Sequence, residues 1–447
     1  MHSIILLFIL ATALGFIIFT TVKLNWHPVM SLLLTTILLG IVVGLNPAEI
    51  LALMRHGFAD ILGSIGLIVV LGSMIGLRLE QTGAIAAIGH QLIRFTGNRH
   101  PGLVLALLGA VLGIPVFCDS GFLVLINLAK SISVQSAASF PALSLSLATG
   151  LYGTHTLVPP TPGPVAAAAN LGVTDTLGWV MLSGILVAIP AVVVVYFFIS
   201  FQSKKIQSKI DLGKLIDVEK IHINAKSLSY SLLMLIVPLV LIAMASVIKL
   251  LNTDFPLQDL LLFMGSPAIA LLSGYMIGLL AKLPEGKSNY DLIQTALQQA
   301  GPILVLTGCG AAFGRVISGS EINFVLVNWI EQVEVNGIVF LLIAFLLASF
   351  FKTIQGSSTS ALIISSVIIA PLSVAAGFVT PWDFALLISA LGAGAMTLSH
   401  ANDSYFWVVI QMSGFDLKNG LRGMSIATIV QGISALLMVI ILYLLTH

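Results

Sequence analysis

Residues 153–164 read Gly-Thr-His-Thr-Leu-Val-Pro-Pro-Thr-Pro-Gly-Pro, inside an otherwise apolar segment of about residues 140–172. Proline lacks a backbone N–H and clashes with the preceding helical turn, so this cluster interrupts any helix that runs through it. In a hydrocarbon environment, an interrupted backbone persists only where protein or a wet cavity satisfies its N–H and C=O groups. The stretch therefore predicts a broken helix beside a polar cavity. The alternative is a kinked span that packs against its neighbours and binds no ligand.

The rest of the chain has the composition of a membrane protein. Of its 447 residues, 58% are hydrophobic and 8% are charged, whereas an ordinary soluble domain carries about 25% charged residues. The apolar residues form runs of roughly 20, the length of a helix that crosses a bilayer, rather than the alternating strands of about 10 residues found in outer-membrane barrels. We therefore predict an all-α polytopic membrane protein, with Met1–Val22 as a retained first span.

Several classes of function are excluded or disfavoured. The formal net charge is +1 and no charged block dominates, which argues against a nucleic-acid partner. Cys118 and Cys309 both lie in apolar runs, which argues against a disulfide framework or a cysteine metal site. No phosphate-binding loop, zinc-protease motif or nucleophile elbow is found in the sequence. We predict no enzyme activity, no cofactor and no metal.

The order of segments repeats along the chain, as expected for an internal duplication. Each half has four plain spans and two longer segments that polar residues interrupt. The plain spans lie at about 3–22, 28–46, 61–79 and 176–200, then at 228–249, 259–281, 301–318 and 423–445; the longer segments are 101–135, 140–172, 337–372 and 383–412, with interruptions at 117–122, 153–164, 352–360 and 399–404.

The positive charges suggest a topology. Residues 202–226 hold six lysines, and an excess of Lys and Arg in short loops marks the cytoplasmic side. We therefore predict a first inverted repeat at 1–201, a cytoplasmic linker at 202–226 and a second repeat at 227–447. Each repeat has five spans, including one discontinuous helix, plus one re-entrant hairpin, and both termini are external; Arg55 and Arg315 do not fit this charge rule. Inverted repeats with discontinuous helices are typical of secondary transporters.

Asp119 and Asp403 stand out because they lie in apolar sequence. A charged residue at the bilayer centre costs about 2.5–3.5 kcal/mol on insertion scales, so it is retained for a reason. One hypothesis is coupling to a proton or cation, or hydrogen bonding to a polyhydroxy substrate. The alternative is that each carboxyl caps a half-helix, a role that Asn402 and Ser404 also suit.

His155 and His400 occupy corresponding positions in the two discontinuous spans, and imidazole titrates in the range that suits a proton relay. The alternative for each is a structural hydrogen-bond donor. At the second hairpin tip, Gln355 and the hydroxyls that follow it match sugar hydroxyls, although small residues there also permit close helix packing. Lys352 is expected to snorkel toward the interface, with a substrate carboxylate as its alternative partner.

The predicted substrate site gathers the polar residues of all four interruptions, and two carboxyls and two histidines within it are candidates for proton coupling: Asp119, Asp403, His155 and His400. The full predicted site is Asp119, Ser120, Gly121, Thr154, His155, Thr156, Pro160, Thr161, Gln355, Gly356, Ser357, Ser358, Thr359, His400, Asn402, Asp403 and Ser404.

The chain resembles the gluconate permease family of bacterial gluconate/proton symporters and their relatives for D-serine and other small hydroxy acids. The resemblance covers the whole chain and rests on Lys23-x-x-x-His27-Pro28, Gly57–Gly83, Pro115–Ile126, Pro159-Pro160-x-Pro162 and Asp403–Trp407. It implies proton-coupled uptake and membership of the ion-transporter superfamily, whose members have two hairpins, scaffold and transport domains, often a homodimer, and an elevator-like motion.

One departure from the family pattern concerns the first hairpin tip. Gluconate permeases commonly show Phe-Phe, an acidic residue and Val-Gly-Phe there, whereas this chain has Phe-Cys-Asp-Ser-Gly-Phe at 117–122. We predict a transporter of the bacterial inner membrane that takes up gluconate or a related small anionic hydroxy acid with protons. The expected partners are the lipid bilayer and a second copy in a homodimer. Glycerate or D-serine as the solute, and a passive uniporter or channel, are the alternatives; a membrane-embedded enzyme would need a nucleophile or metal constellation that the sequence lacks.

Overall fold

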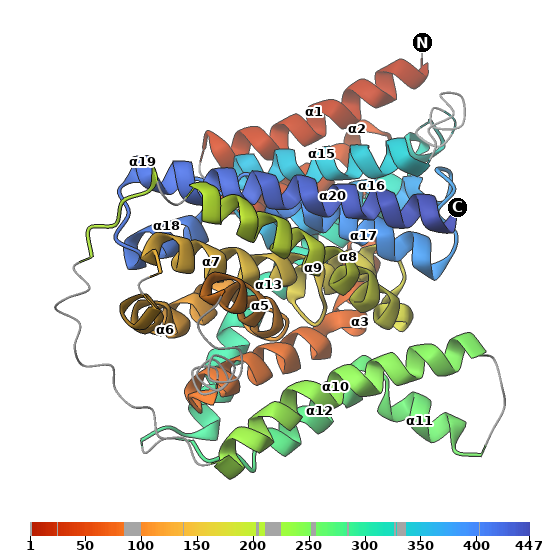
Figure 1. Ribbon diagram of the computed structural model, residues 1–447. Coiled ribbons are helices and arrows are strands. Elements are labelled where there is room, and N and C mark those ends of the chain that lie inside the picture. The colour runs from red at the N-terminus through yellow and green to blue at the C-terminus, as the bar shows by residue number, and fades with distance from the viewer. Residues whose placement is uncertain are drawn as a thin grey trace.

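The structure, a computed structural model, describes residues 2–24, 26–84, 100–136, 138–202, 205–210, 225–251, 256–283, 286–325, 328, 337–401 and 403–447. Within these ranges the chain forms helices and no strands, in agreement with the predicted all-α class (Figure 1). The elements are α1 (His2–Val22), α2 (Pro28–Val42), α3 (Pro47–Gln81), α5 (Pro101–Leu112), α6 (Cys118–Ser136), α7 (Phe140–Leu157), α8 (Pro162–Asn170), η1 (Thr174–Thr176), α9 (Leu177–Gln202), α10 (Ala225–Leu251), α11 (Gln258–Met264), α12 (Pro267–Gly278), α13 (Asn289–Ser318), α15 (Gly337–Gln355), α16 (Ser358–Ser373), α17 (Pro381–Met396), α18 (Ser404–Met412), α19 (Leu417–Gly420), η4 (Leu421–Ser425) and α20 (Ile426–Thr446).

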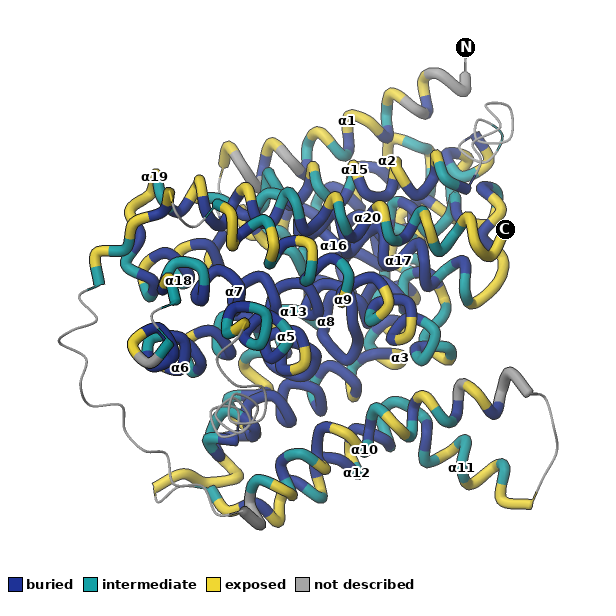
Figure 2. The backbone as a smooth tube through the Cα atoms, viewed as in Figure 1, coloured by how far each residue is buried: buried dark blue, intermediate teal, exposed yellow. Residues whose placement is uncertain are grey.

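Six stretches of the described helices are long and apolar enough to cross a bilayer, and the bent pair α11–α12 makes a seventh if it counts as one span. Buried residues fill the centre of the bundle, and exposed residues line its outside (Figure 2). Large apolar side chains such as Phe197, Leu346 and Leu444 are among those exposed, as expected where the solvent is lipid. The six stretches are Pro47–Gln81, Thr174–Gln202, Leu228–Ala245, Asn289–Ser318, Gly337–Gln355 and Leu417–Thr446.

Helices end at each of the four polar interruptions. Residues 113–117 separate α5 from α6, and residues 158–161 separate α7 from α8. In the second half, Gly356 and Ser357 separate α15 from α16, and residues 397–403 separate α17 from α18. The prediction of a plain span at 259–281 is wrong, because α11 and α12 meet there at an angle of 69°. Pro267 begins α12, and a proline favours the first turn of a new helix over the interior of a continuous one.

The helices pack in two groups, and each group draws on both halves of the sequence. In the α3 group, α3 packs along α13 and α12, α2 packs on α13, and α10 packs on α12. In the α7 group, α7 packs on α5, α6 and α9, while α17 packs on α15, α20 and α9. Helices α10 and α12 lie along one edge of the bundle (Figure 1). The groups meet mainly where α13 contacts α16, α3 contacts α8 and α10 contacts α9.

Arg78 closes one end of the α3 group. Its side chain is buried, and it donates hydrogen bonds to Gly278 O (2.5 Å), Ala281 O (2.8 Å) and Asn289 Oδ1 (2.6 Å). Carbonyl groups at a helix C-terminus lack partners within the helix and carry partial negative charge, so a guanidinium stabilises them. One side chain therefore joins the end of α3 to the end of α12 and the start of α13.

Candidate functional site

The end of α7 lies against the backbone of its neighbours. A Cβ atom added to Gly392 of α17 would stand 2.5 Å from Thr156 O, and one added to Gly72 of α3 would stand 3.3 Å from Pro160 O. A larger residue at Gly392 would therefore push α17 away from α7. These close approaches place the α7–α8 interruption against α17, from the second half of the chain, and against α3.

Lys352 and Asp403 form a buried ion pair. Lys352 Nζ lies 2.5 Å from Asp403 Oδ2, and the two side chains are 1% and 5% exposed. Lys352 Nζ also donates to Gly356 O (2.8 Å), and Ser399 Oγ donates to Asp403 Oδ2 (2.5 Å). The prediction that Lys352 snorkels is wrong, because its ammonium group is buried and the carboxylate of Asp403 compensates its charge. Desolvated charges of this kind persist only with such partners.

Asp403 also has the capping role that the sequence left open. It is the N-cap of α18, where its Oδ1 accepts a hydrogen bond from Tyr405 N (3.0 Å). One carboxyl thus pairs with Lys352 through one oxygen and caps α18 through the other. Both carboxyl oxygens of Asp403, in the interruption between α17 and α18, therefore already have partners within the protein.

An aromatic cluster links this ion pair to the first half of the chain. Lys352 Nζ lies 5.6 Å from the centre of the Tyr152 ring, within the range of a cation–π interaction. The Tyr152 and Tyr405 rings are 5.2 Å apart, and Tyr405 donates its hydroxyl to Ala148 O (2.8 Å). The two interrupted helices are therefore in direct contact through side chains.

Asp119 lies in the first turn of α6 and differs from Asp403 in its bonding. Its Oδ1 atom is buried and has no hydrogen-bond partner among the described residues. Its carboxyl is close enough to Lys352 and Asp403 to interact with both electrostatically. Asp119 therefore interacts electrostatically with the ion pair, and its Oδ1 remains an acceptor without a partner among the described residues.

Thr154 and His155 are also buried with unused polar atoms. Thr154 Oγ1 and His155 Nδ1 have no hydrogen-bond partner within the described part of the chain. The His155 ring lies 5.8 Å from the Phe117 ring. A small cavity of about 10 Å³, lined by residues of α3, of the α5–α6 interruption and of the α7–α8 interruption, adjoins His155, and this volume matches a single water molecule.

Three other predicted residues of this turn have different surroundings. Thr156 Oγ1 donates to Tyr152 O (3.1 Å), and Thr161 Oγ1 donates to Val158 O (2.6 Å), so both hydroxyls are bonded to their own chain segment. Pro160 lines the small cavity. Of the three hydroxyls near this turn, Thr154 is the one left with an unpaired oxygen.

The tip between α15 and α16 combines a forced turn with free polar groups. Gly356 has φ = +77°, a conformation that favours glycine. Both side-chain polar atoms of Gln355 are buried without a hydrogen-bond partner among the described residues. Ser357 caps α16 by accepting from Ser360 N (3.2 Å), and Thr359 lies against Gly163 at the start of α8. Ser358, half-buried at the first position of α16, interacts with Tyr152.

The remaining predicted residues have no described contact with the side chains of the Lys352–Asp403 ion pair. His400 Nε2 lies 3.1 Å from Thr353 O, so this ring already has a backbone partner. Ser404 is exposed, Ser120 interacts with Glu80, and Gly121 packs against Leu151. Asn402 lies outside the described residues.

Tyr152 and Ser399 contact the ion pair and were not predicted as site residues. Tyr152 lies one helical position before the polar turn that begins at Gly153, and its hydroxyl is buried without a geometrically satisfactory partner among the described residues. An aromatic residue beside a proline-rich turn gives no distinctive signal, because aromatic side chains are common in any buried helix. Ser399 lies within the predicted interruption at 399–404, and this position could have identified it as a site residue.

The comparisons with known proteins agree with this architecture. Residues 4–445 match the family described as "GntP family permease". The chain is 31% identical to an uncharacterized permease of Haemophilus influenzae, over 96% of this chain and 91% of that protein. It is 28% identical to a gluconate permease of Pseudomonas aeruginosa (91% and 90% covered) and 26% identical to the D-serine transporter DsdX of Escherichia coli K12 (94% of each covered).

A solved structure shares the fold. The YdaH transporter of Alcanivorax borkumensis, described as having an unusual topology, superposes with a TM-score of 0.67 at 18% identity, over 93% of this chain and 96% of that one. Apolar helices broken at polar, mutually packed interruptions define a multi-pass membrane transport protein. The chain belongs to the GntP family of permeases.

Proposed function

We propose that this chain takes up a small hydroxylated carboxylate, gluconate or a related sugar acid, in symport with protons. The observation that carries the proposal concerns Asp119. Its buried Oδ1 has no hydrogen-bond partner among the described residues, and its carboxyl interacts electrostatically with an ion pair that is already closed. An ionisable group placed in this way inside a membrane protein is suited to carry a proton. The names of relatives, gluconate permease and D-serine transporter, support a small acid as the solute.

Helix N-termini supply the attraction for the solute carboxylate. Helices α6, α8, α16 and α18 all begin at the interruptions, and each N-terminus presents free N–H groups and partial positive charge. Lys352 is committed to Asp403, so the carboxylate is bound by backbone groups at α8 and α16. Thr154, His155 and Gln355 have buried polar atoms without partners among the described residues, and these atoms bind the solute hydroxyls.

Asp119 is the proposed proton carrier, with His155 as the second candidate. Asp403 and His400 are less suited, because each already has a fixed partner. Protonation of Asp119 would reduce repulsion of an arriving carboxylate, and release of the proton would weaken binding. Proton and solute would therefore bind together.

The proposed transport cycle moves the α7 group against the α3 group in an elevator-like manner. The supporting observation is that the interruptions belong to the α7 group, whereas α3 and α13 only flank them. We further propose ten spans in two inverted repeats, 1–201 and 227–447, a cytoplasmic linker at 202–226, and a homodimer in the bacterial inner membrane.

Uptake by proteoliposomes tests the proposal. With an acid outside and a neutral inside, the protein should accumulate D-gluconate, D-glycerate or D-serine above the level reached without a pH gradient. Counterflow without accumulation would favour a passive uniporter instead. No transport of any of the three acids, by a protein that is folded in detergent, would contradict the proposed solute class.

A further inference from the structure

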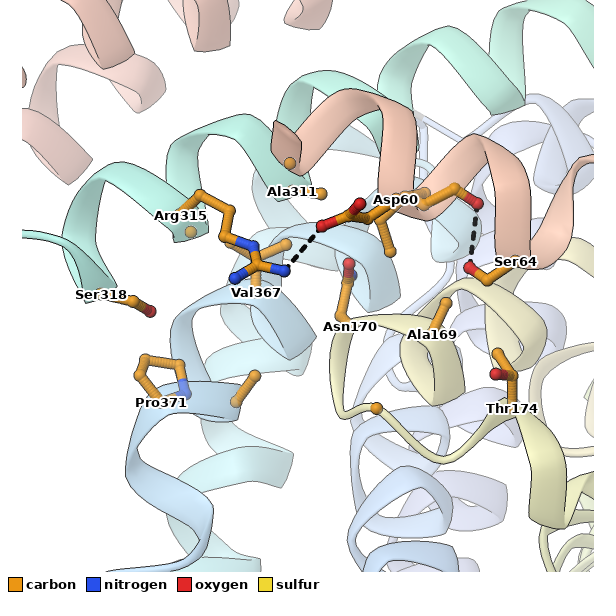
Figure 3. A pocket seen from close by; sticks show the side chains of 15 residues that line it. Asp60, Ser64, Ala169, Asn170, Thr174, Ala311, Arg315, Ser318, Val367 and Pro371 are labelled. Carbon is orange, nitrogen blue, oxygen red and sulfur yellow. Dashed lines mark hydrogen bonds and ion pairs between the residues drawn. The ribbon is translucent and has the colours of Figure 1, made fainter. Parts of the chain in front are cut away.

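A second and larger pocket lies where the two helix groups meet. It has a volume of about 500 Å³ and is lined by α3 and α13 on one side and by the ends of α8 and α16 on the other (Figure 3). Small-molecule sites commonly measure about 300–1,000 Å³. None of the residues predicted from the sequence lines this pocket, and its charged lining residues are Asp60 and Arg315.

Arg315 offers hydrogen-bond donors to this pocket. Its Nη2 atom lies 2.7 Å from Asp60 Oδ2, and both side chains are 56% exposed. Figure 3 shows the two side chains meeting from opposite helices, α13 and α3. Nε and Nη1 of Arg315 have no hydrogen-bond partner in the part of the chain that the structure describes. A guanidinium has five N–H donors in a fork that matches a carboxylate, so unused donors remain beside Asp60.

Neutral polar groups surround this cation. Asn170, at the end of α8, donates from Nδ2 to Ser366 Oγ (2.8 Å), while its Oδ1 atom is buried without a hydrogen-bond partner among the described residues. The hydroxyls of Ser64 and Ser318 also line the pocket. Apart from its counter-ion Asp60, this guanidinium is surrounded by neutral acceptors and hydroxyls, a set that matches a hydroxylated carboxylate better than an apolar solute or a free cation.

The pocket and the interruption between α7 and α8 lie along the same two helices, α3 and α8. Along α3, Ser64 lines the large pocket and Gly72 lines the small cavity beside His155; eight residues of helix correspond to about 12 Å. Helix α8 runs between the same two places, from Pro162 to Asn170. Arg315 lies in the last turn of α13, at the opposite end of that helix from the Arg78 contact.

We propose that Arg315 is a first-capture subsite for the carboxylate of the transported solute, at the end of α13 remote from Arg78, with Asp60 as the counter-ion that the solute displaces. Asn170 accepts a hydrogen bond from a solute hydroxyl. This inference rests on the proposed uptake of a small carboxylate. Since exposed ion pairs are weak, a carboxylate exchanges with Asp60 readily, and the exposed position suits capture better than tight binding.

The test replaces Arg315 with cysteine and then restores a positive charge by chemical modification of that cysteine. Uptake is measured in right-side-out vesicles with whichever of D-gluconate, D-glycerate and D-serine the wild type accumulates. For Arg315→Cys we expect KM to rise about tenfold with Vmax within about twofold, because capture and not translocation is impaired. A cationic thiosulfonate carrying a trimethylammonium group should return KM to within about threefold of the wild type, whereas the anionic sulfonatoethyl reagent should not. Treated wild-type protein is the control, because Cys118 and Cys309 are both buried.

Asp60→Asn separates capture from a purely structural ion pair. If Arg315 captures the solute, this variant keeps or lowers KM, because the cation loses its competitor. If the pair only holds α3 to α13, Asp60→Asn and Arg315→Cys lower Vmax alike and neither reagent restores uptake, which would overturn the subsite. Normal uptake with an unchanged KM in Arg315→Cys would also overturn it. Absence of uptake by the wild type would instead overturn the proposed function, and this inference with it.

Discussion

Two regions of the α7 group, the α17–α18 interruption and the pair of interruptions in the first half, differ in how their polar groups are bonded. Between α17 and α18, Asp403 pairs with Lys352, accepts from Ser399 and caps α18. Around the start of α6 and the end of α7, Asp119 and Thr154 each keep a buried polar atom without a partner among the described residues. The α17–α18 interruption thus forms a closed network, whereas the α5–α6 and α7–α8 interruptions present buried polar atoms without partners among the described residues.

This difference separates two reasons for placing charge in a membrane. A closed ion pair is neutral overall and can be buried at a tolerable cost, so it holds two segments in register without any solute. Unpaired buried polar atoms carry a penalty until something bonds to them. We therefore expect substitutions in the closed network to affect mainly folding, and substitutions at the free groups to affect mainly transport.

Breaking the ion pair should have the largest effect. Lys352→Met leaves Asp403 buried without its countercharge, so we expect the free energy of unfolding to fall by about 3–5 kcal/mol. Thermal or denaturant unfolding in detergent measures this change. The double variant Lys352→Met/Asp403→Asn is the matched control, and it should recover most of the loss because neither side chain of the pair is then left as an uncompensated charge. Equal destabilisation of the single and double variants would show that the pair is not the source of the effect.

Asp119 provides the complementary case. Asp119→Asn keeps the size of the side chain but removes the titrating group, so accumulation driven by an acid-outside gradient should fall by about tenfold or more. The free energy of unfolding should change by less than about 1 kcal/mol, since no ion pair is broken. Uptake by proteoliposomes measures accumulation, counterflow shows whether solute exchange persists, and denaturant unfolding in detergent measures the free energy of unfolding. Asp259→Asn, at an exposed position of α11, is the control; full accumulation by Asp119→Asn would assign coupling to another group.

Gly356 tests the geometry of the closed network. Alanine at φ = +77° should lower the free energy of unfolding by about 1–2 kcal/mol, because a Cβ is disfavoured in the left-handed region. The change also displaces the carbonyl that Lys352 bonds. Gly63→Ala, a helical position of α3 with open space around the added Cβ, should be neutral or stabilising. Unfolding curves that rank the two variants the other way would contradict the proposed strain.

Two neighbouring threonines give the finest comparison. Thr154→Val removes a hydroxyl that has no partner among the described residues, whereas Thr156→Val removes one that is bonded to its own helix. If the free hydroxyl serves the solute, Thr154→Val should raise KM by about threefold to tenfold, corresponding to about one hydrogen bond. Thr156→Val should leave KM unchanged. Kinetics of uptake for both variants, measured side by side, decide the assignment.

The sequence was sufficient for the class of fold and for the places where helices break, because proline, glycine and charge act locally. Pro159–Pro164 interrupts a helix whatever surrounds it. The fate of Lys352 could not be predicted in the same way, because its partner Asp403 lies 51 residues away in the sequence and only packing brings them together. The Asp60–Arg315 contact is separated by 255 residues, and the charge rule identified Arg315 as an exception without naming its partner.

The bend between α11 and α12, by contrast, has a local sequence signal that the prediction overlooked. Gly265, Ser266 and Pro267 were present in the predicted plain span 259–281, and they carry the same kind of local signal as the turn at 153–164. Apolar residues on both sides favoured a single span, because a sum of hydropathy does not register one proline. A search for proline at each possible first helical turn would have found the break.

Arg78 has a consequence for how the molecule can move. Its three hydrogen bonds tie α3, α12 and α13 at one place, and a lysine there could not reproduce the planar fork that reaches all three acceptors at once. Sliding between these helices would strand a buried guanidinium. The hinge of any large displacement must therefore lie elsewhere, and a cross-link within this trio should leave turnover intact.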